Sequence, residues 1–320
     1  MSRVRSARQE SIVTPVDASV ETRVDTIEAL RTLLAQRGFD SEASTRVLAA
    51  AHVCLGFRLI RETDDAKIPI GATKVAGAAD LPSGTAWPAA RGVHFRFIAQ
   101  FDLSAVSRLL PQSPLPERGL LSFFWCQEHE IGTTSEGVRV IHTPDTSSLV
   151  RMKDPWSRPP KPVGLLGRMM GKRPAPQEDA FCPCRVELAL KVTIPIPDGP
   201  RGIVTGLVST DEFRVIHRGI QEKDPATVEL LDVGHRLLGE PLPIQEFVEL
   251  DAEWDPNVPA WEDWDARVKA AATWRLLLQV DADDAPEFRF GDLGSIYFMI
   301  RETDLSARRW DNVCVVMQSH

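Results

Sequence analysis

The side chains best suited to chemistry in this sequence are amides and carboxylates at two matching corners. Each of two apolar segments, 97–102 and 276–281, ends in the pattern Gln-x-Asp. Two acids that share a cavity and hold different pKa values can act as general acid and general base, so one cleft between these corners would suit a carboxylate hydrolase. The candidate binding residues are the corners and their expected neighbours, namely Trp87, Gln100, Asp102, Gln279, Asp281, Asp292 and Arg301. The alternative interpretation is that the same groups cap strands and turns.

Two histidines form a candidate metal site. If the chain turns around Gly132–Gly137, His129 and His142 lie nearly opposite each other. Glu128 or Glu130 would then complete the two-His, one-carboxylate set that binds divalent transition metals. Two histidines on a polar hairpin can equally be solvated, and we assign no cofactor to the chain.

The cysteines and the remaining acids form no complete site. Cys182 and Cys184 could supply half of a tetrahedral zinc site, but neither a second cysteine pair nor a nearby histidine provides the other two ligands. The acids from Asp281 to Asp292 lack the spacing and the glycine of a helix-loop-helix calcium loop. The sequence also lacks the phosphate-loop, dinucleotide-binding, nucleophile-elbow and zinc-protease motifs, which argues against the most common enzyme classes.

The elements that must position these residues begin with a helical region. Residues 1–20 read as a flexible tail, and residues 21–60 read as a hairpin of two helices. The first helix is expected to begin near Thr22. The second is expected to be capped by Ser41 and to carry Leu55 on its apolar stripe.

The rest of the chain divides at a proline-rich segment. Residues 61–150 form a first β-rich repeat, and residues 185–320 form a second one that packs with the first as one domain. Residues 151–184 form a basic insertion whose seven prolines prevent regular structure over most of its length. A short helix is expected within 225–238, and a further helix from about Trp261 to Thr273.

The two repeats share an order of motifs. In each, an apolar strand ends in Gln-x-Asp, a polar loop follows, and a glycine precedes an apolar, aromatic strand, at Gly119–Trp125 and Gly294–Ile300. Because a single strand pair cannot bury both of its faces, we expect duplicated antiparallel units to stack and share one core. The sequence therefore predicts an α+β fold built from duplicated antiparallel β-rich units with an N-terminal helical hairpin.

Several stretches are specific enough to compare with a known family. They are Leu81–Pro88, Phe97–Leu103, Pro116–Leu121, His235–Gly239, Pro243–Gln245 and Gln279–Gln318. Together they resemble the YwqG-like family of bacterial proteins, and the resemblance extends from about Lys67 to Gln318. It implies an α+β fold with internally duplicated β units. The family is a domain of unknown function, so the resemblance transfers no catalytic residue.

Composition and charge favour a protein partner over nucleic acid or membrane. The net charge is −8, which disfavours binding to phosphate backbones or anionic lipid. An odd number of cysteines and the lack of a signal-peptide core or membrane-length apolar run indicate the cytoplasm. Trp254, Trp261 and Trp264 are spaced closely enough to form a partner-facing patch. Our first hypothesis is a protein-interaction module with an immunity or accessory role, and the alternative is the hydrolase described above.

Overall fold

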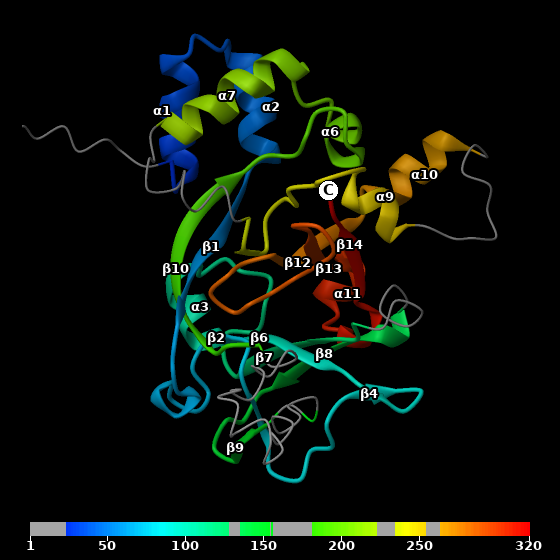
Figure 1. Cartoon of the computed structure of the whole chain (residues 1–320). Coiled ribbons are helices and arrows are strands. Elements are labelled where there is room, and N and C mark those ends of the chain that lie inside the picture. Colours follow the sequence, from blue (N-terminus) through cyan, green and yellow to red (C-terminus); the bar gives the residue numbers. More distant parts are fainter. Residues whose placement is uncertain (1–23, 128–134, 154, 156–180, 223–233, 254–262) are drawn as a thin grey trace, which may run out of the picture.

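The computed structural model describes residues 24–127, 135–153, 155, 181–222, 234–253 and 263–320 (Figure 1). The helices are α1 (Ile27–Gln36), α2 (Ser41–Ala50), α3 (Leu103–Leu109), α6 (Pro200–Thr205), α7 (Thr210–Glu222), α9 (Val248–Ala252), α10 (Trp264–Ala271) and α11 (Glu302–Ser306). The strands are β1 (His52–Arg61), β2 (Lys74–Val75), β3 (Ala79–Pro82), β4 (Ala89–Ala90), β5 (Val93–His94), β6 (Arg96–Asp102), β7 (Leu120–Trp125), β8 (Val138–Thr143), β9 (Leu149–Met152), β10 (Cys184–Thr193), β11 (Arg236–Leu237), β12 (Trp274–Asp281), β13 (Ser295–Arg301) and β14 (Cys314–Gln318). Short 3₁₀ turns are η1 (Asp65–Lys67), η2 (Ser135–Gly137) and η3 (Trp310–Asn312).

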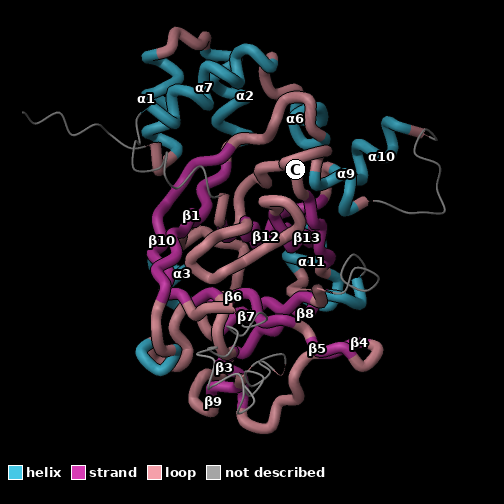
Figure 2. Tube along the Cα trace, in the orientation of Figure 1, coloured by secondary structure: helices cyan, strands magenta, loops and turns pink. Residues whose placement is uncertain are grey.

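One ten-stranded antiparallel sheet organises these elements. Its order is β14-β13-β12-β11-β1-β10-β2-β6-β7-β8. The central pair is β1 with β10, and four strands follow on each side in the same sequential order. The predicted α+β class with an antiparallel sheet and an N-terminal helical hairpin is confirmed (Figure 2).

The first strand of each half pairs with the other half. β1 precedes β2 in the chain but pairs with β11, through Leu55 opposite Leu237. β10 precedes β11 but pairs with β2, through Cys184 opposite Val75. Because β1 and β10 also pair with each other over ten residues, each half is built around a strand from the other.

Backbone details repeat between the halves. Where β6 pairs with β7 the register shifts around Ile98, and where β12 pairs with β13 it shifts around Leu277. The N–H of Ala76 donates to the carbonyl of Ile98, and the N–H of Leu238 donates to that of Leu277, both at 2.9 Å. Ala76 and Leu238 have φ angles of 61° and 66°, a region that non-glycine residues rarely adopt. The two halves therefore share one backbone path at the start of their sheets.

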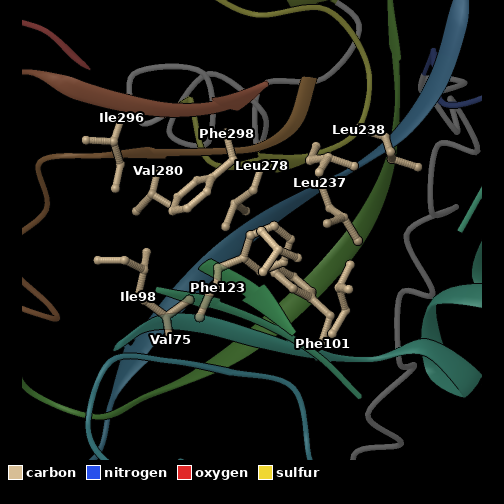
Figure 3. Packing of buried hydrophobic residues seen from close by; sticks show 14 of the residues in the cluster. Val75, Ile98, Phe101, Phe123, Leu237, Leu238, Leu278, Val280, Ile296 and Phe298 are labelled. Atoms are coloured by element: carbon tan, nitrogen blue, oxygen red, sulfur yellow. The ribbon is translucent and has the colours of Figure 1, made fainter. Parts of the chain in front are cut away.

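The sheet folds over so that its two halves face each other. The rings of Phe123 on β7 and Phe298 on β13 meet edge to face with centroids 5.2 Å apart. Figure 3 shows Ile98 and Phe101 from the first half lying across the core from Val280 and Phe298 of the second half. This shared apolar core stabilises the fold, because it removes side chains of both halves from water.

Three helices cover one end of the long β1–β10 pair. α1, α2 and α7 lie together above it (Figure 1) and pack on Val192 and Ile194. The first helix begins at Ile27, because the Thr26 hydroxyl caps it by accepting the N–H of Ala29 at 3.1 Å. The expected cap, Thr22, lies outside the described residues.

Several sequence expectations differ from the structure. Asp40, and not Ser41, caps the second helix by accepting the N–H of Ala43 at 2.7 Å. This helix ends at Ala50, so Leu55 lies on β1 in the core and not on a helical stripe. Such an apolar run fits a buried strand as well as a helix, and the partner strands decide. Most of the proline-rich insertion lies outside the described residues, but Arg151 at its start belongs to β9, which pairs with β3.

We expect Phe298→Ala to lower the free energy of unfolding by about 3–5 kcal/mol, because it removes a fully buried ring between the sheet halves. Urea unfolding should show this loss. Leu293→Ala, at a side chain that is 72% exposed, is the control and should change little. A double-mutant cycle with Phe123→Ala should give a coupling of about 0.5–1.5 kcal/mol, and strict additivity would contradict direct packing of the two rings.

Candidate functional site

Arg236 is a buried cation on the outer face of the second half. Its neighbour Leu237 enters the core, so Arg236 points to the opposite face, where it is only 5% exposed. Nε donates to the carbonyl of Gly234 and Nη1 to that of Glu240, both at 2.9 Å. Among the described residues, no carboxylate lies within 4.0 Å of the guanidinium. A buried charge without an opposite charge beside it is costly, so this arginine is the first feature that indicates a ligand.

Lys191 reaches the same face from β10. A Cβ atom at Gly56 on β1 would lie 2.5 Å from Cε of Lys191, so the lysine side chain crosses the strand where that glycine leaves room. Gly56 is itself opposite Arg236 in the register of β1 and β11. The three strands therefore gather two cations, 7% and 5% exposed, on one patch of sheet.

An apolar cavity of about 330 Å³ opens beside these cations. One wall of the cavity is formed by β10 and the residues that follow it. Another wall is formed by α7, through Phe213, His217 and Ile220. These three positions share one face of a helix, which explains why they line the cavity together. The described residues of the lining are Val24, Leu190, Lys191, Val192, Thr193, Ile194, Ile196, Phe213, His217, Ile220, Arg236, Glu240, Pro241 and Leu242. We refer to this space as the α7 cavity.

The titratable groups among the described lining residues are two cations, one histidine and one acid. Burial and the nearby Arg236 lower the pKa of His217, which is therefore neutral at pH 7 and stacks on Phe213 with ring centroids 5.7 Å apart. Burial raises the pKa of Glu240, and Arg201, which hydrogen-bonds this carboxyl, opposes that shift. The one acid in the lining is thus already bound to another arginine. Such a cavity is suited to bind an anion with an apolar body.

A second group of acids lies on the far side of Glu240. Glu249 on α9 is buried, which raises its pKa to about 7. Glu240, Glu249 and Arg201 border a space of only about 10 Å³, enough for a single water molecule. A larger cavity of about 520 Å³ is lined by Arg201 and Arg275, but each of these arginines already pairs with a glutamate.

Comparison with known families gives a match over most of the chain. The family described as a domain of unknown function (DUF1963) matches residues 73–319. The chain belongs to the DUF1963 family. The expected membership in a family of unknown function is confirmed. No curated protein compared with the chain matches it.

In this DUF1963 protein the hydrogen bonds of the first Gln-x-Asp corner join it to residues of its own half. Gln100 accepts the N–H of Asp80 at 3.0 Å and donates to the Asp80 carboxylate at 2.8 Å. Asp102 caps α3 by accepting the N–H of Ser104 at 2.9 Å. Trp87 donates to the carbonyl of Phe95 at 2.7 Å.

The second corner is likewise local. Gln279 accepts the N–H of Leu242 at 2.9 Å and donates to Asp281 at 3.0 Å. Arg301 pairs with Glu253 at 2.7 Å and lies over the ring of Trp274, while Asp292 is exposed. The described hydrogen bonds and ion pairs join each corner to its own loops and do not join the two corners to each other. That these residues bind a ligand stays a prediction.

The candidate metal residues are placed only in part. His129 lies outside the described residues, and His142 on β8 is 3.1 Å from the carbonyl of Arg118. Cys182 and Cys184 are both free thiols, and burial raises the pKa of Cys184 to about 12. Within the described ranges, no cluster of three or more His, Cys, Asp or Glu side chains could hold a metal ion. In the same ranges, none of the helices has the length and apolarity that crossing a bilayer requires.

The sequence analysis missed Lys191, His217 and Arg236. They come from β10, α7 and β11, and no local motif links them. The available signal was Gly56, a glycine in the interior of an apolar strand, which often marks the close approach of another group.

We expect Asp80→Asn to lower the free energy of unfolding by about 3 kcal/mol at pH 7, because Arg151 and Lys74 would lose a fully buried carboxylate. Burial alone raises the pKa of Asp80, but hydrogen bonds from Arg151, Gly71 and Gln100 outweigh it and lower the pKa below its usual value near 3.8. Its stabilisation is therefore present above pH 4 and is lost as the pH falls further. Urea unfolding from pH 3 to 7 should show less acid sensitivity in Asp80→Asn, whereas Asp284→Asn, in an exposed ion pair, should behave as wild type.

For Glu249 the expected pH dependence has the opposite sign. Its pKa is about 7 in the folded protein against 4.5 for an ordinary glutamate, so the folded state holds the proton more tightly. The free energy of unfolding should fall as the pH rises from about 5 to 7, by roughly 3 kcal/mol at most, since each pKa unit corresponds to about 1.4 kcal/mol. Glu249→Gln should remove this fall, and the exposed Glu42→Gln should not. Parallel pH profiles of wild type and Glu249→Gln would contradict the shift.

Proposed function

We propose that this DUF1963 protein binds a small organic anion with an apolar body in the α7 cavity. The observation that carries the proposal is Arg236, a buried guanidinium that lines an apolar cavity and has no described carboxylate within ion-pair distance. An anionic ligand would supply the missing charge, and hydrogen bonds to a charged group contribute about 1.5–3 kcal/mol each. The apolar walls from β10 and α7 would bury the rest of the ligand.

The hydrolase hypothesis finds less support from the described geometry. It needs two acids of different pKa in a cavity that a substrate can enter. Glu240 and Glu249 do have raised pKa values, but the space that they share holds about one water molecule. The α7 cavity, which is large enough for a ligand, is lined by one acid.

We also propose, from sequence motifs and composition, that the chain is a YwqG-like bacterial protein of the cytoplasm with an internally duplicated domain. A protein partner, in an immunity or accessory role, is the second candidate function. One observation favours it: Trp264 on α10 is 50% exposed, which suits a partner contact. The other two tryptophans of that patch, Trp254 and Trp261, lie outside the described residues. Neither nucleic acid nor membrane is proposed as a partner.

The test of anion binding uses four eight-carbon probes with different head groups. Octanoate and octane-1-sulfonate should raise the thermal midpoint of the wild-type protein and give saturable heats in titration calorimetry. Octan-1-ol and octylammonium should do neither, because they cannot neutralise Arg236. Equal binding of all four probes, or of none, would contradict the proposal.

Two variants locate the binding. Arg236→Gln should weaken octanoate binding tenfold or more, while Arg236→Lys, which keeps the charge, should retain more of it. Arg96→Gln is a matched control, because Arg96 is equally buried on another strand and lies over the ring of Phe181, away from the α7 cavity. Loss of binding in the control would indicate general destabilisation and not a local site.

A further inference from the structure

The first half of the sheet contains the same buried cation as the second, but with an acid beside it. Lys74 is opposite Gln100 in the register of β2 and β6, as Arg236 is opposite Gln279 in that of β11 and β12. Lys74 is fully buried, and its ammonium donates to Asp65 at 2.8 Å. The matched positions therefore differ in whether the chain itself provides the negative charge.

Six residues after each of these two cations, at positions 80 and 242, the halves carry an acid and an apolar residue. The N–H of Asp80 donates to Oε1 of Gln100, and the N–H of Leu242 donates to Oε1 of Gln279, at 3.0 and 2.9 Å. Asp80 and Leu242 thus occupy the same place in the two halves. Asp80 supplies a carboxylate, whereas Leu242 supplies an apolar wall of the α7 cavity.

Two further acids of the first half, which follow the end of β1, are replaced at the matching positions in and after β10. Arg185 is opposite Lys74 and Gly56 is opposite Arg236, so these two residues also match. Arg185 bonds to Glu62, and at the corresponding place Lys191 crosses Gly56. Three residues after Glu62 comes Asp65, and three residues after Lys191 comes Ile194. Where the first half has acids, the α7 cavity is therefore lined by Lys191, Ile194 and Leu242.

Asp281 in the second half accepts some of the hydrogen bonds that Asp80 accepts in the first half. Asp281 accepts hydrogen bonds from Gln279 and from the N–H of Gly234, much as Asp80 does from Gln100 and Gly71. It forms no ion pair with Arg236, so it replaces the hydrogen bonds of Asp80 and leaves the charge unmatched.

We propose that the ligand of the α7 cavity is a monocarboxylate whose head group gives Arg236 the negative charge that acids of the first half give Lys74. This inference rests on the proposed anion binding and narrows it to one chemical class. A carboxylate matches the planar fork of Arg236, with which it can form two parallel hydrogen bonds. A volume of about 330 Å³ holds roughly ten non-hydrogen atoms, at about 30 Å³ for each group the size of a water molecule. An unbranched or ring-containing acid of about eight carbons fits that limit.

The test restores the acid within the chain. Leu242→Asp places a carboxylate where the first half has Asp80, and Leu242→Asn is the uncharged control of the same shape. The side chain at this position is 37% exposed, so both variants should fold. We expect Leu242→Asp to have a higher thermal midpoint than Leu242→Asn and to bind octanoate at least tenfold more weakly than Leu242→Asn, because both variants lose the same apolar wall and only the aspartate adds a charge.

The outcomes distinguish the carboxylate assignment from the broader proposal that the α7 cavity binds an anion. Octanoate and octane-1-sulfonate could bind wild type while Leu242→Asp binds octanoate as tightly as Leu242→Asn does. In that case the head group lies elsewhere and the inference is overturned, while anion binding stands. Tighter binding of the sulfonate than of octanoate would overturn the carboxylate assignment in the same way. If neither anion binds wild type, both the inference and the proposed function fail.

Discussion

A cation buried on the face of a sheet requires a negative charge close to it, and this constraint is met differently in the two halves of the protein. In the first half, Lys74 sits among Asp65 and Asp80, and Arg151 completes a closed ionic network with them. In the second half, Arg236 keeps the same register but faces an apolar cavity. The same backbone path therefore holds a network of ion pairs in the first half and borders a cavity in the second half. The functional proposal follows from that contrast and not from a catalytic motif.

The exchange of first strands explains how the cavity is built. Lys191 and Arg236 are 45 positions apart in the sequence, and they share a face only because β1 lies between β10 and β11. Gly56 in the middle of β1 provides the space for the lysine. The family match begins at residue 73 and does not include β1, although this strand is at the centre of the sheet. Gly56, which leaves room for Lys191 beside the cavity, therefore lies outside the matched residues.

Sequence patterns predicted the paired strands of each half well, because alternation and long apolar runs reflect burial on one or both faces. The apolar runs that form β7, β12 and β13 were expected as strands. The two Gln-x-Asp corners have equivalent places in the sheet, since Gln100 is opposite Lys74 and Gln279 is opposite Arg236. β1 was expected as helix, since its apolar residues also fit a helical stripe and its partner β10 is more than 120 residues away. α7 had no expectation, although Phe213, Ile216 and Ile220 have the spacing of an amphipathic helix, so the sequence did contain the signal for it. The α7 cavity could not be predicted, since its position depends on the register of three strands that are distant in sequence.

The crossed pairing of β1 and β10 has one more consequence. Two identical chains could form the same ten-stranded sheet if each gave its first strand to the other, but strict twofold symmetry would then place the same residues at both corners. A single chain is free of that condition. It can hold an aspartate at position 80 and a leucine at position 242, so the two corners of the sheet need not carry the same charge.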